Sequence, residues 1–409
     1  MGIGAVRAVW LGSTLGLVTA FLMFAPAARS ADQYWAFGDS ITNAVNLDPD
    51  YAATCTPAIY PAKCGYQGRL QDNLGKTVFN RGVPGEKTPD GLSRIDDPGE
   101  PLNANRCDDP NAGDVLALME GSNNNNISAA TIQSNLQAMM DLAATKCVHS
   151  LIASIIRRLA PWAGIGSTIG APNHTKTTDV ASAIGQVATA SNRTLVGVWD
   201  VLCDDPEWPA AQPCFNTHYW GKFISGDPGH VDSSGYNIME PLFRNAITAH
   251  PVAGAATNLS PSSNITDTTP TFSWDEHTDS DWYFLDVNSL SSHGWWYPEE
   301  AICSGGTCTV TPAGVLAAGH HDWRVRTRNL QGVGAWTPTQ PFSTCAETNL
   351  VVANSTPPPF IACDTLSTAA SGFNVSNGED VTFSAGTKIV LDNGFTVETG
   401  GSFEGRVDY

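Results

Sequence analysis

The pattern of apolar and polar residues in this sequence changes near residue 250. Before it, apolar runs typical of buried strands alternate with longer helix-like runs. The strand-like runs are Tyr34–Phe37, Val115–Met119, Leu151–Ile156 and Thr194–Trp199, and the helix-like runs are Ser128–Ala144, Asp179–Ala190 and Gly235–Ala249. Such alternation is typical of a parallel sheet flanked by helices. We therefore predict one α/β domain over residues 31–250.

After His250, the Ser/Thr/Asn/Pro-rich stretch "PVAGAATNLSPSSNITDTTP" indicates a linker. The strand-like runs beyond it are Thr271–Trp274, Trp282–Val287, Thr307–Thr311, His321–Thr327 and Thr339–Ser343. Short alternating runs between turn residues are typical of an all-β sandwich. The stretches "TTPTFSW", "HDWRVRTRN" and "GVGAWTPTQPF" resemble a fibronectin type III-like module, which we expect at residues 251–345.

A second proline-rich break, "ANSTPPPFIAC", precedes a small β module at residues 346–409. Its glycines recur about every eight residues, at Gly378, Gly386, Gly394, Gly400 and Gly405. This spacing indicates stacked rungs or a small meander. The segment is similar to the small β modules that end many secreted bacterial proteins.

Length, charge and cysteine content narrow the class of protein. A chain of 409 residues is too long for one core, so two or three domains are expected. The net charge of -19 would repel phosphate backbones and anionic lipid surfaces, which argues against a nucleic-acid partner. Residues 1–30 have a basic start, an apolar core and small residues before the end, as in a signal peptide cleaved after Ser30.

The ten cysteines fall in neighbouring couples, which fits disulfides in an oxidising compartment better than metal sites, because the sequence contains neither CxxC nor HExxH. The couples are Cys55/Cys64, Cys107/Cys147, Cys203/Cys214, Cys303/Cys308 and Cys345/Cys363. We expect these disulfides to hold two loops, Asp48–Cys64 and Asp96–Asn111, as walls of a cleft. No later segment is apolar enough to span a membrane, so we expect a secreted, periplasmic or extracellular protein without a transmembrane segment.

Four stretches carry candidate chemistry. Ser40, in "FGDSIT", follows the end of the first strand-like run, where loops often carry catalytic residues. The others are "FNRGVPGEKTPDG" with Gly82, "DVLALMEGSNNNN" with Asn123, and "SGDPGHVDSSGYNIM" with Asp227 three residues before His230. A serine hydroxyl needs a general base and oxyanion donors to act as a nucleophile, and an Asp–His pair can supply that base. The nucleophile-elbow pattern GxSxG is absent.

In this order, the four stretches resemble the SGNH hydrolase family, also called GDSL esterases and lipases, over residues 33–248. The resemblance implies a three-layer α/β/α fold of the flavodoxin-like kind and hydrolysis of esters or thioesters without metal or organic cofactor. It makes Ser40 the nucleophile, His230 its base and Asp227 the residue that orients His230. The oxyanion hole would comprise the Ser40 and Gly82 amides and the Asn123 side chain.

Each assignment has a structural alternative. Ser40 could be the N-cap of the following helix, Gly82 an ordinary turn glycine, and His230 a surface histidine. Asn124 could replace Asn123, because four asparagines follow one another. We interpret Asp39 as a structural turn residue. Two departures from the family pattern are Asn124, where relatives frequently have aspartate, and the stretch "IIRRLAPWAGIGSTIGAPNHT", which leaves the acyl pocket unassigned.

The sequence supports two functional hypotheses. The first is a secreted ester hydrolase of the carboxylesterase or lipase type, acting on lipids, small esters or acylated polysaccharide. The second is a carbohydrate-binding or adhesive protein with an inactive hydrolase-like domain. We expect Trp274 and Trp323 to fill the sandwich core, whereas Trp295-Trp296, in a loop-like region, could stack on sugars. The complete Ser40/Asp227/His230 set favours an enzyme.

Overall fold

The structure is a computed structural model. It describes residues 33–44, 65–124, 127–155, 172–198, 223–224, 227–231, 233–290, 294–345, 347–354, 358 and 360–407. The predicted signal peptide, the couples Cys55/Cys64 and Cys203/Cys214, the loop Asp48–Cys64 and most of the unassigned stretch from Ile155 to Thr175 lie outside these residues.

A five-stranded parallel sheet forms the centre of the N-terminal domain. Its strands, in spatial order, are β2 (Thr77–Gly82), β1 (Gln33–Gly38), β3 (Val115–Met119), β4 (His149–Ala153) and β5 (Thr194–Val196). Helices on both faces bury β1, β3 and β4, and such strands read as continuous apolar runs. The prediction of a parallel α/β domain is confirmed.

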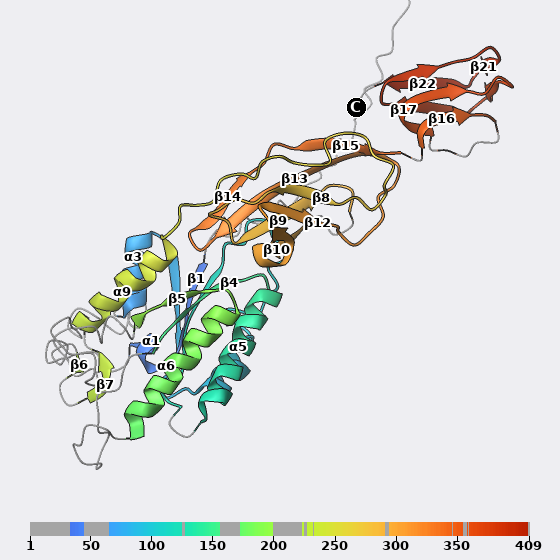
Figure 1. Cartoon of the computed structure of the whole chain (residues 1–409). Coiled ribbons are helices and arrows are strands. Elements are labelled where there is room, and N and C mark those ends of the chain that lie inside the picture. The colour runs from blue at the N-terminus through green and yellow to red at the C-terminus, as the bar shows by residue number, and fades with distance from the viewer. Residues whose placement is uncertain are drawn as a thin grey trace, which may run out of the picture. The chain divides into compact units, whose positions relative to one another are not determined.

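Helices cover both faces of this sheet (Figure 1). One face packs against α3 (Tyr66–Leu74) and α9 (Ser233–Ile247), and the other against α5 (Ala129–Thr145) and α6 (Pro172–Ala190). Because side chains alternate along a strand, Ala36 belongs to the first core and its neighbour Phe37 to the second. The three-layer arrangement therefore follows from strands that are apolar at successive positions.

Four short elements lie beside the carboxyl ends of the strands or provide residues for that region. They are α1 (Ser40–Asn43), α4 (Thr88–Arg94) and an antiparallel pair of β6 (Phe223–Ile224) and β7 (Asp227–Val231). α1, α4 and β7 each overlap one of the stretches singled out in the sequence. The candidate site is built from these elements.

The middle region consists of two antiparallel sheets. One contains β10 (Gly294–Pro298), β9 (Trp282–Val287), β13 (Gly319–Asn329), β14 (Gly332–Trp336) and β15 (Gln340–Thr344), and the other contains β11 (Cys303–Ser304), β12 (Thr307–Val310) and β8 (Phe272–Asp275). A short helix, α10 (Glu299–Ile302), links β10 to β11. Trp274 and Trp323 are buried in the core between the sheets, as predicted.

The prediction of a loop at Trp295-Trp296 is wrong, because both residues lie in β10. Trp296 is buried; its ring lies 5.2 Å from the Phe284 ring, and its Nε1 donates a hydrogen bond to the Asp109 carbonyl at 2.8 Å. Trp295 points to the opposite side of the strand and is 40% exposed. The sequence did not indicate a strand here, because two adjacent aromatic residues break the usual alternation of apolar and polar side chains. Each side of β10 has its own apolar surroundings.

The sandwich also contacts the N-terminal domain, and both lie within the compact unit Ala31–Tyr409. Arg328, at the end of β13, is fully buried and donates through Nη1 to the carbonyls of Ala112 at 2.7 Å and Cys147 at 3.0 Å. The Trp296 amide donates to the Cys107 carbonyl. The loop Asp96–Asn111 was expected to line a cleft, but its contacts at Cys107 and Asp109 are with the sandwich.

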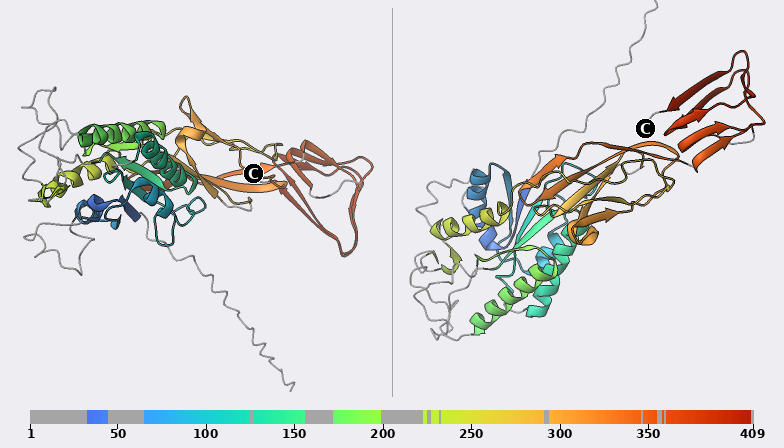
Figure 2. Two further views of the ribbon diagram at one scale, coloured as in Figure 1. Left: turned by 90° about the horizontal axis from the view of Figure 1, so that it is seen from below. Right: turned by 45° about the horizontal axis from the view of Figure 1, so that its top comes forward.

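The C-terminal module is a stack of parallel rungs, shown in red in Figure 2. Its main sheet contains β16 (Glu347–Val352), β17 (Phe360–Thr368), β19 (Asp380–Ala385) and β22 (Ser402–Val407), with β20 (Lys388–Val390) also pairing with β17; β18 (Phe373–Val375) pairs with β21 (Phe395–Val397). Of the two predicted arrangements, stacked rungs are confirmed, since a meander would be antiparallel.

A glycine repeat marks the length of each rung. Phe360 is in register with Phe383 on the next rung, and Phe383 is in register with Gly405 on the rung after that. Gly372 and Gly394 are one rung apart, have positive φ and occupy stacked corners. A Cβ on Gly372 would lie 2.6 Å from the Gly394 carbonyl oxygen, so only glycine fits.

Three of the predicted disulfides lie within the described residues, and all three are formed: Cys107–Cys147, Cys303–Cys308 and Cys345–Cys363. They join loops, neighbouring strands and the two β regions, respectively. Among the helices that the structure describes, none combines the length and apolar composition needed to cross a membrane.

Candidate active site

The carboxyl ends of three neighbouring strands lie level with one another. Gly38, the last residue of β1, is in register with Gly82 on β2 and with Met119 on β3. The Val83 amide continues this ladder by donating to the Gly38 carbonyl at 2.8 Å. The segments that follow β1, β2 and β3 therefore emerge at one edge of the sheet, where ligands bind in open α/β folds. Three of the four predicted motifs meet there.

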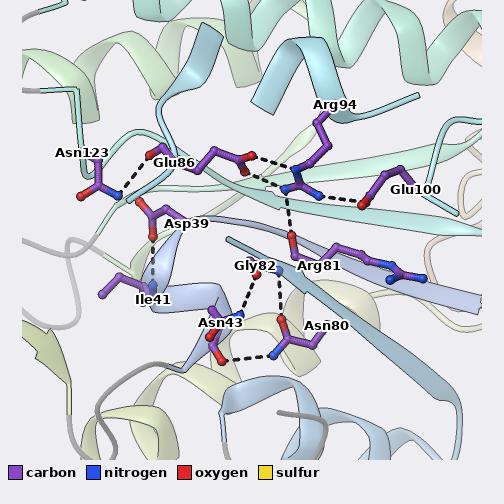
Figure 3. A network of polar contacts seen from close by, with 10 residues as sticks. All are labelled: Asp39, Ile41, Asn43, Asn80, Arg81, Gly82, Glu86, Arg94, Glu100 and Asn123. Atoms are coloured by element: carbon purple, nitrogen blue, oxygen red, sulfur yellow. Dashed lines mark hydrogen bonds and ion pairs between the residues drawn. The ribbon is translucent and has the colours of Figure 1, made fainter. Parts of the chain in front are cut away.

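Asp39 shapes the turn on which Ser40 lies. Its Oδ1 accepts a hydrogen bond from the Ile41 amide at 3.0 Å, which makes Asp39 the N-cap of α1, and its Oδ2 accepts one from the Ser122 amide at 3.1 Å. Figure 3 shows the first of these bonds. The interpretation of Asp39 as a structural residue is confirmed, and the alternative that Ser40 is the cap is wrong.

Ser40 and His230 are 190 positions apart in sequence but adjacent in the structure. The distance from His230 Nε2 to Ser40 Oγ is 2.9 Å. Ser40 is 5% exposed and His230, on β7, is half-buried. Helix α9, which follows β7, is tied to α1 by a hydrogen bond from the Tyr236 hydroxyl to the Ile41 carbonyl at 2.9 Å. The hydroxyl and the imidazole are thus arranged for proton transfer between them.

Asp227 begins β7, and its backbone is in register with Ile224 on β6. Its side chain lies outside what the structure describes, so its orienting role stays a prediction.

Gly82 is in close contact with the end of α1. A Cβ at this position would lie 2.1 Å from the Asn43 amide nitrogen, so the approach requires glycine. The Asn43 side chain donates to the Gly82 carbonyl at 2.7 Å, and the Gly82 amide donates to Asn80 Oδ1 at 3.0 Å (Figure 3). The amide assigned to the oxyanion hole therefore already has an acceptor in its own strand.

The two asparagines after β3 have different surroundings. Asn123 is half-buried, and its Nδ2 donates to the Glu86 carbonyl at 3.1 Å (Figure 3). Asn124 is 4% exposed, and its Oδ1 accepts from the Thr88 amide at 3.1 Å at the start of α4. The Asn124 side chain thus supplies an acceptor at the start of α4. Asn124 serves the packing of α4, and Asn123 is the more exposed of the two asparagines.

Sequence reasoning missed an ion-pair network beside this edge. Arg94 donates to both carboxylate oxygens of Glu86, at 2.7 and 2.6 Å, to the Arg81 carbonyl at 3.0 Å, and it pairs with Glu100 at 2.9 Å (Figure 3). Its guanidinium lies 4.0 Å from the centroid of the Phe37 ring. Burial opposes the charge of Arg94, but the hydrogen bonds and charges of Glu86 and Glu100 raise its pKa.

The network fixes the Gly82–Asn123 region, because Glu86 holds Arg94 with its carboxylate and Asn123 with its carbonyl. Nothing in the sequence marks Glu86 and Arg94 as partners except their proximity on either side of a predicted turn. Bidentate pairs of this kind are among the stronger charge-assisted hydrogen bonds.

Glu120 is a second residue that the sequence did not identify. It follows the apolar run of β3 and is 1% exposed. Burial, followed by the negative charges of Asp39 and Glu86, raises its pKa well above the usual range, against the opposing charge of Arg94. These effects favour the protonated form of its carboxyl group over the carboxylate.

The described segments contain no candidate metal-binding site. In these segments, no three side chains of His, Cys, Asp or Glu gather closely enough to hold a metal ion.

Comparison with known proteins adds a family likeness. The sequence profile of the GDSL-like lipase/acylhydrolase family matches residues 36–236. Among solved structures, a lipase/acylhydrolase from Enterococcus faecalis is 21% identical, with a TM-score of 0.38, covering 53% of this chain and 96% of its own. An M. smegmatis aryl esterase is 15% identical, with a TM-score of 0.38, covering 54% and 99%. No curated protein sequence matches the chain.

Proposed function

We propose that this chain is a serine esterase whose nucleophile is Ser40. Residues 36–236 match the GDSL-like lipase/acylhydrolase family, whose members hydrolyse esters, and this match supports the proposal. The observation that carries the proposal is the 2.9 Å contact between Ser40 Oγ and His230 Nε2. A histidine at hydrogen-bonding distance is what a serine hydroxyl requires to act as a nucleophile near neutral pH.

In the first half of the reaction, Ser40 Oγ attacks the ester carbonyl carbon while His230 accepts the hydroxyl proton. The carbonyl oxygen becomes an oxyanion, and the protonated His230 then donates its proton to the leaving alcohol. An acyl group remains on Ser40. In the second half, His230 activates a water molecule, which releases the carboxylic acid and regenerates the hydroxyl.

The Ser40 amide, the Gly82 amide and the Asn123 side-chain amide are the proposed oxyanion donors. The Gly82 amide donates to Asn80 Oδ1 and the Asn123 side-chain amide donates to the Glu86 carbonyl. The substrate oxyanion would take their place as acceptor, and a charged acceptor forms the stronger bond. Loss of one such donor typically lowers kcat by about 100-fold or more.

Asp227 is the proposed partner of the second imidazole nitrogen. It begins the strand that contains His230, and a carboxylate there would fix the tautomer and stabilise the imidazolium. We further propose secretion after removal of residues 1–30. The three disulfides among the described residues support an oxidising compartment.

Lipids, small esters and acylated polysaccharide are the proposed substrate classes. A sugar-binding or adhesive role based on Trp295-Trp296 loses support, because Trp296 is buried against the N-terminal domain and only Trp295 presents a surface.

The test is hydrolysis of p-nitrophenyl esters of increasing chain length, and of acetylated xylan, by the full chain and by Ser40→Ala. We expect the wild type to be active and Ser40→Ala to lose at least about 1,000-fold in kcat with unchanged circular dichroism. Ser122→Ala is the matched control, since it removes a neighbouring hydroxyl but keeps the amide that bonds Asp39. Undiminished turnover by Ser40→Ala would refute the assignment.

A further inference from the structure

Strand β22 lies in the last rung that the structure describes, and one of its edges is open there. In the described part of the chain, β22 pairs with β19 on one side only, and it lies at the opposite edge of the sheet from β16 (Figure 1). The outer edge of such a strand presents main-chain N–H and C=O groups that can pair with another strand. Stacked-repeat proteins generally cover this end of the stack.

Apolar side chains accompany this edge. Phe403 is only partly buried, although its ring packs on Phe383 at 5.1 Å. Val407 is 44% exposed, and Val397, on the neighbouring strand of the same rung, is 43% exposed. Further along the stack, Phe360 and Phe383 are buried. The interior of the stack is therefore incompletely covered at its last rung.

The sequence of β22, Ser-Phe-Glu-Gly-Arg-Val, is complementary to itself when it runs antiparallel about Gly405. In that register, Glu404 of one chain faces Arg406 of the other, and the same pair occurs twice by symmetry. Phe403 likewise faces Val407. Glu404 and Arg406 are more than half exposed and now form an ion pair within the strand, with Nη2 and Oε2 2.9 Å apart. They can therefore exchange partners without leaving solvent.

Charged residues on an edge strand often prevent association, because like charges of neighbouring chains repel. In β22 the two charges have opposite signs and are placed symmetrically about a glycine, so the antiparallel register brings opposite charges together. A parallel in-register pairing would instead place Glu404 beside Glu404. The charge order therefore favours a two-fold arrangement, which is the commonest symmetry of protein dimers.

We propose that the C-terminal module is a dimerisation surface, in which β22 pairs antiparallel with β22 of a second copy about Gly405. The pairing joins the two main sheets, covers Phe403 and Val407, and forms two Glu404–Arg406 pairs between chains. The proposal does not depend on the esterase assignment, because it uses none of the residues near Ser40.

The test uses sedimentation of the full chain over a concentration series. Wild type should dimerise, and Glu404→Arg and Arg406→Glu should each raise the dimer dissociation constant by roughly tenfold or more, because each variant places like charges opposite one another. A mixture of the two variants should form a heterodimer, since the two arginines on β22 of the first variant then face the two glutamates on β22 of the second.

The mixing step separates pairing between chains from an effect within one strand, because each variant has lost the ion pair within its own strand. Ester hydrolysis should be the same in all samples, so failure of the esterase proposal would be seen separately. A wild type that stays monomeric at the highest concentration, single variants that dimerise like wild type, or a mixture that contains no heterodimer would overturn the proposal.

Discussion

At the scale of single residues, we expect Glu120 to contribute to the pH dependence of stability. Its folded-state pKa is raised by burial and by Asp39 and Glu86, whereas an unfolded chain has a glutamate pKa of about 4.3. The folded state therefore holds a proton that the unfolded state releases. This contribution is complete below the unfolded pKa and is lost as the pH rises toward the folded pKa.

We predict that Glu120→Gln gains stability relative to wild type as the pH rises above the unfolded glutamate pKa of about 4.3 toward the folded pKa. The gain should approach about 1.4 kcal/mol for each pH unit between the unfolded and folded pKa values, because the amide cannot ionise. Urea unfolding of both proteins across this range measures it. The exposed Glu347→Gln is the matched control, and a difference between Glu120→Gln and wild type that stays constant with pH would contradict the account.

At the scale of elements, the close approach of β2 to α1 determines where Ser40 lies. Gly82→Ala would place a methyl group 2.1 Å from the Asn43 amide, so either α1 or the end of β2 must move. Since a displacement of about 1 Å at a catalytic group can cost about 100-fold in rate, we predict at least that loss in kcat/KM.

Esterase kinetics on a p-nitrophenyl ester measures the effect of Gly82→Ala. The control is Gly185→Ala in α6, where a Cβ meets no atom within 4 Å and where alanine favours the helix by about 0.5–1 kcal/mol. Kinetics of Gly82→Ala indistinguishable from wild type would show that α1 is not fixed by this contact.

The elements that could be predicted from sequence are those with a direct physical signature. Continuous apolar runs marked β1, β3 and β4 because helices cover both sides of these strands. The direction of the C-terminal strands could not be predicted, since parallel and antiparallel pairs bury the same alternating side chains. Glycine recurs once per rung, at Gly372 and Gly394, and this recurrence indicates stacked parallel rungs. The shorter spacing of about eight residues between successive glycines was easier to see in the sequence and did not distinguish the two arrangements.

For the site, the order of motifs pointed to Ser40 and His230, and the fold brings them to 2.9 Å. The Glu86–Arg94 pair was not predictable, because a single sequence does not show which of many charged residues become partners. The hydrogen bond from the Gly82 amide to Asn80 was also not predictable, because it is decided by local backbone geometry.

At the scale of the whole molecule, the sandwich is attached to the N-terminal domain through buried polar contacts. Arg328 donates to the Ala112 and Cys147 carbonyls, and its guanidinium lies 4.3 Å from the Trp296 ring centroid. Ala112 and Cys147 precede β3 and β4, so these contacts lie at the amino ends of the strands, whereas Ser40 follows the carboxyl end of β1. The sandwich thus supports the domain from the edge away from the proposed nucleophile.

We predict that Arg328→Ala lowers the free energy of unfolding by roughly 3 kcal/mol, because two buried carbonyls lose their donor and the rings of Trp282 and Trp296 lose a contact. Chemical denaturation followed by tryptophan fluorescence measures it. The partly exposed Arg324→Ala, whose ion pair with Asp286 lies on the sandwich itself, should cost about 1 kcal/mol or less. Equal effects of the two variants would argue against a firmly attached sandwich.

The most direct test of the central claim is covalent labelling with a fluorophosphonate, followed by mass spectrometry of the modified peptide. We predict one label per chain on Ser40, none in Ser40→Ala, strongly reduced labelling in His230→Asn, and normal labelling in Ser122→Ala. A label on a serine other than Ser40, or labelling of Ser40→Ala equal to that of wild type, would contradict the assignment of Ser40 as the nucleophile.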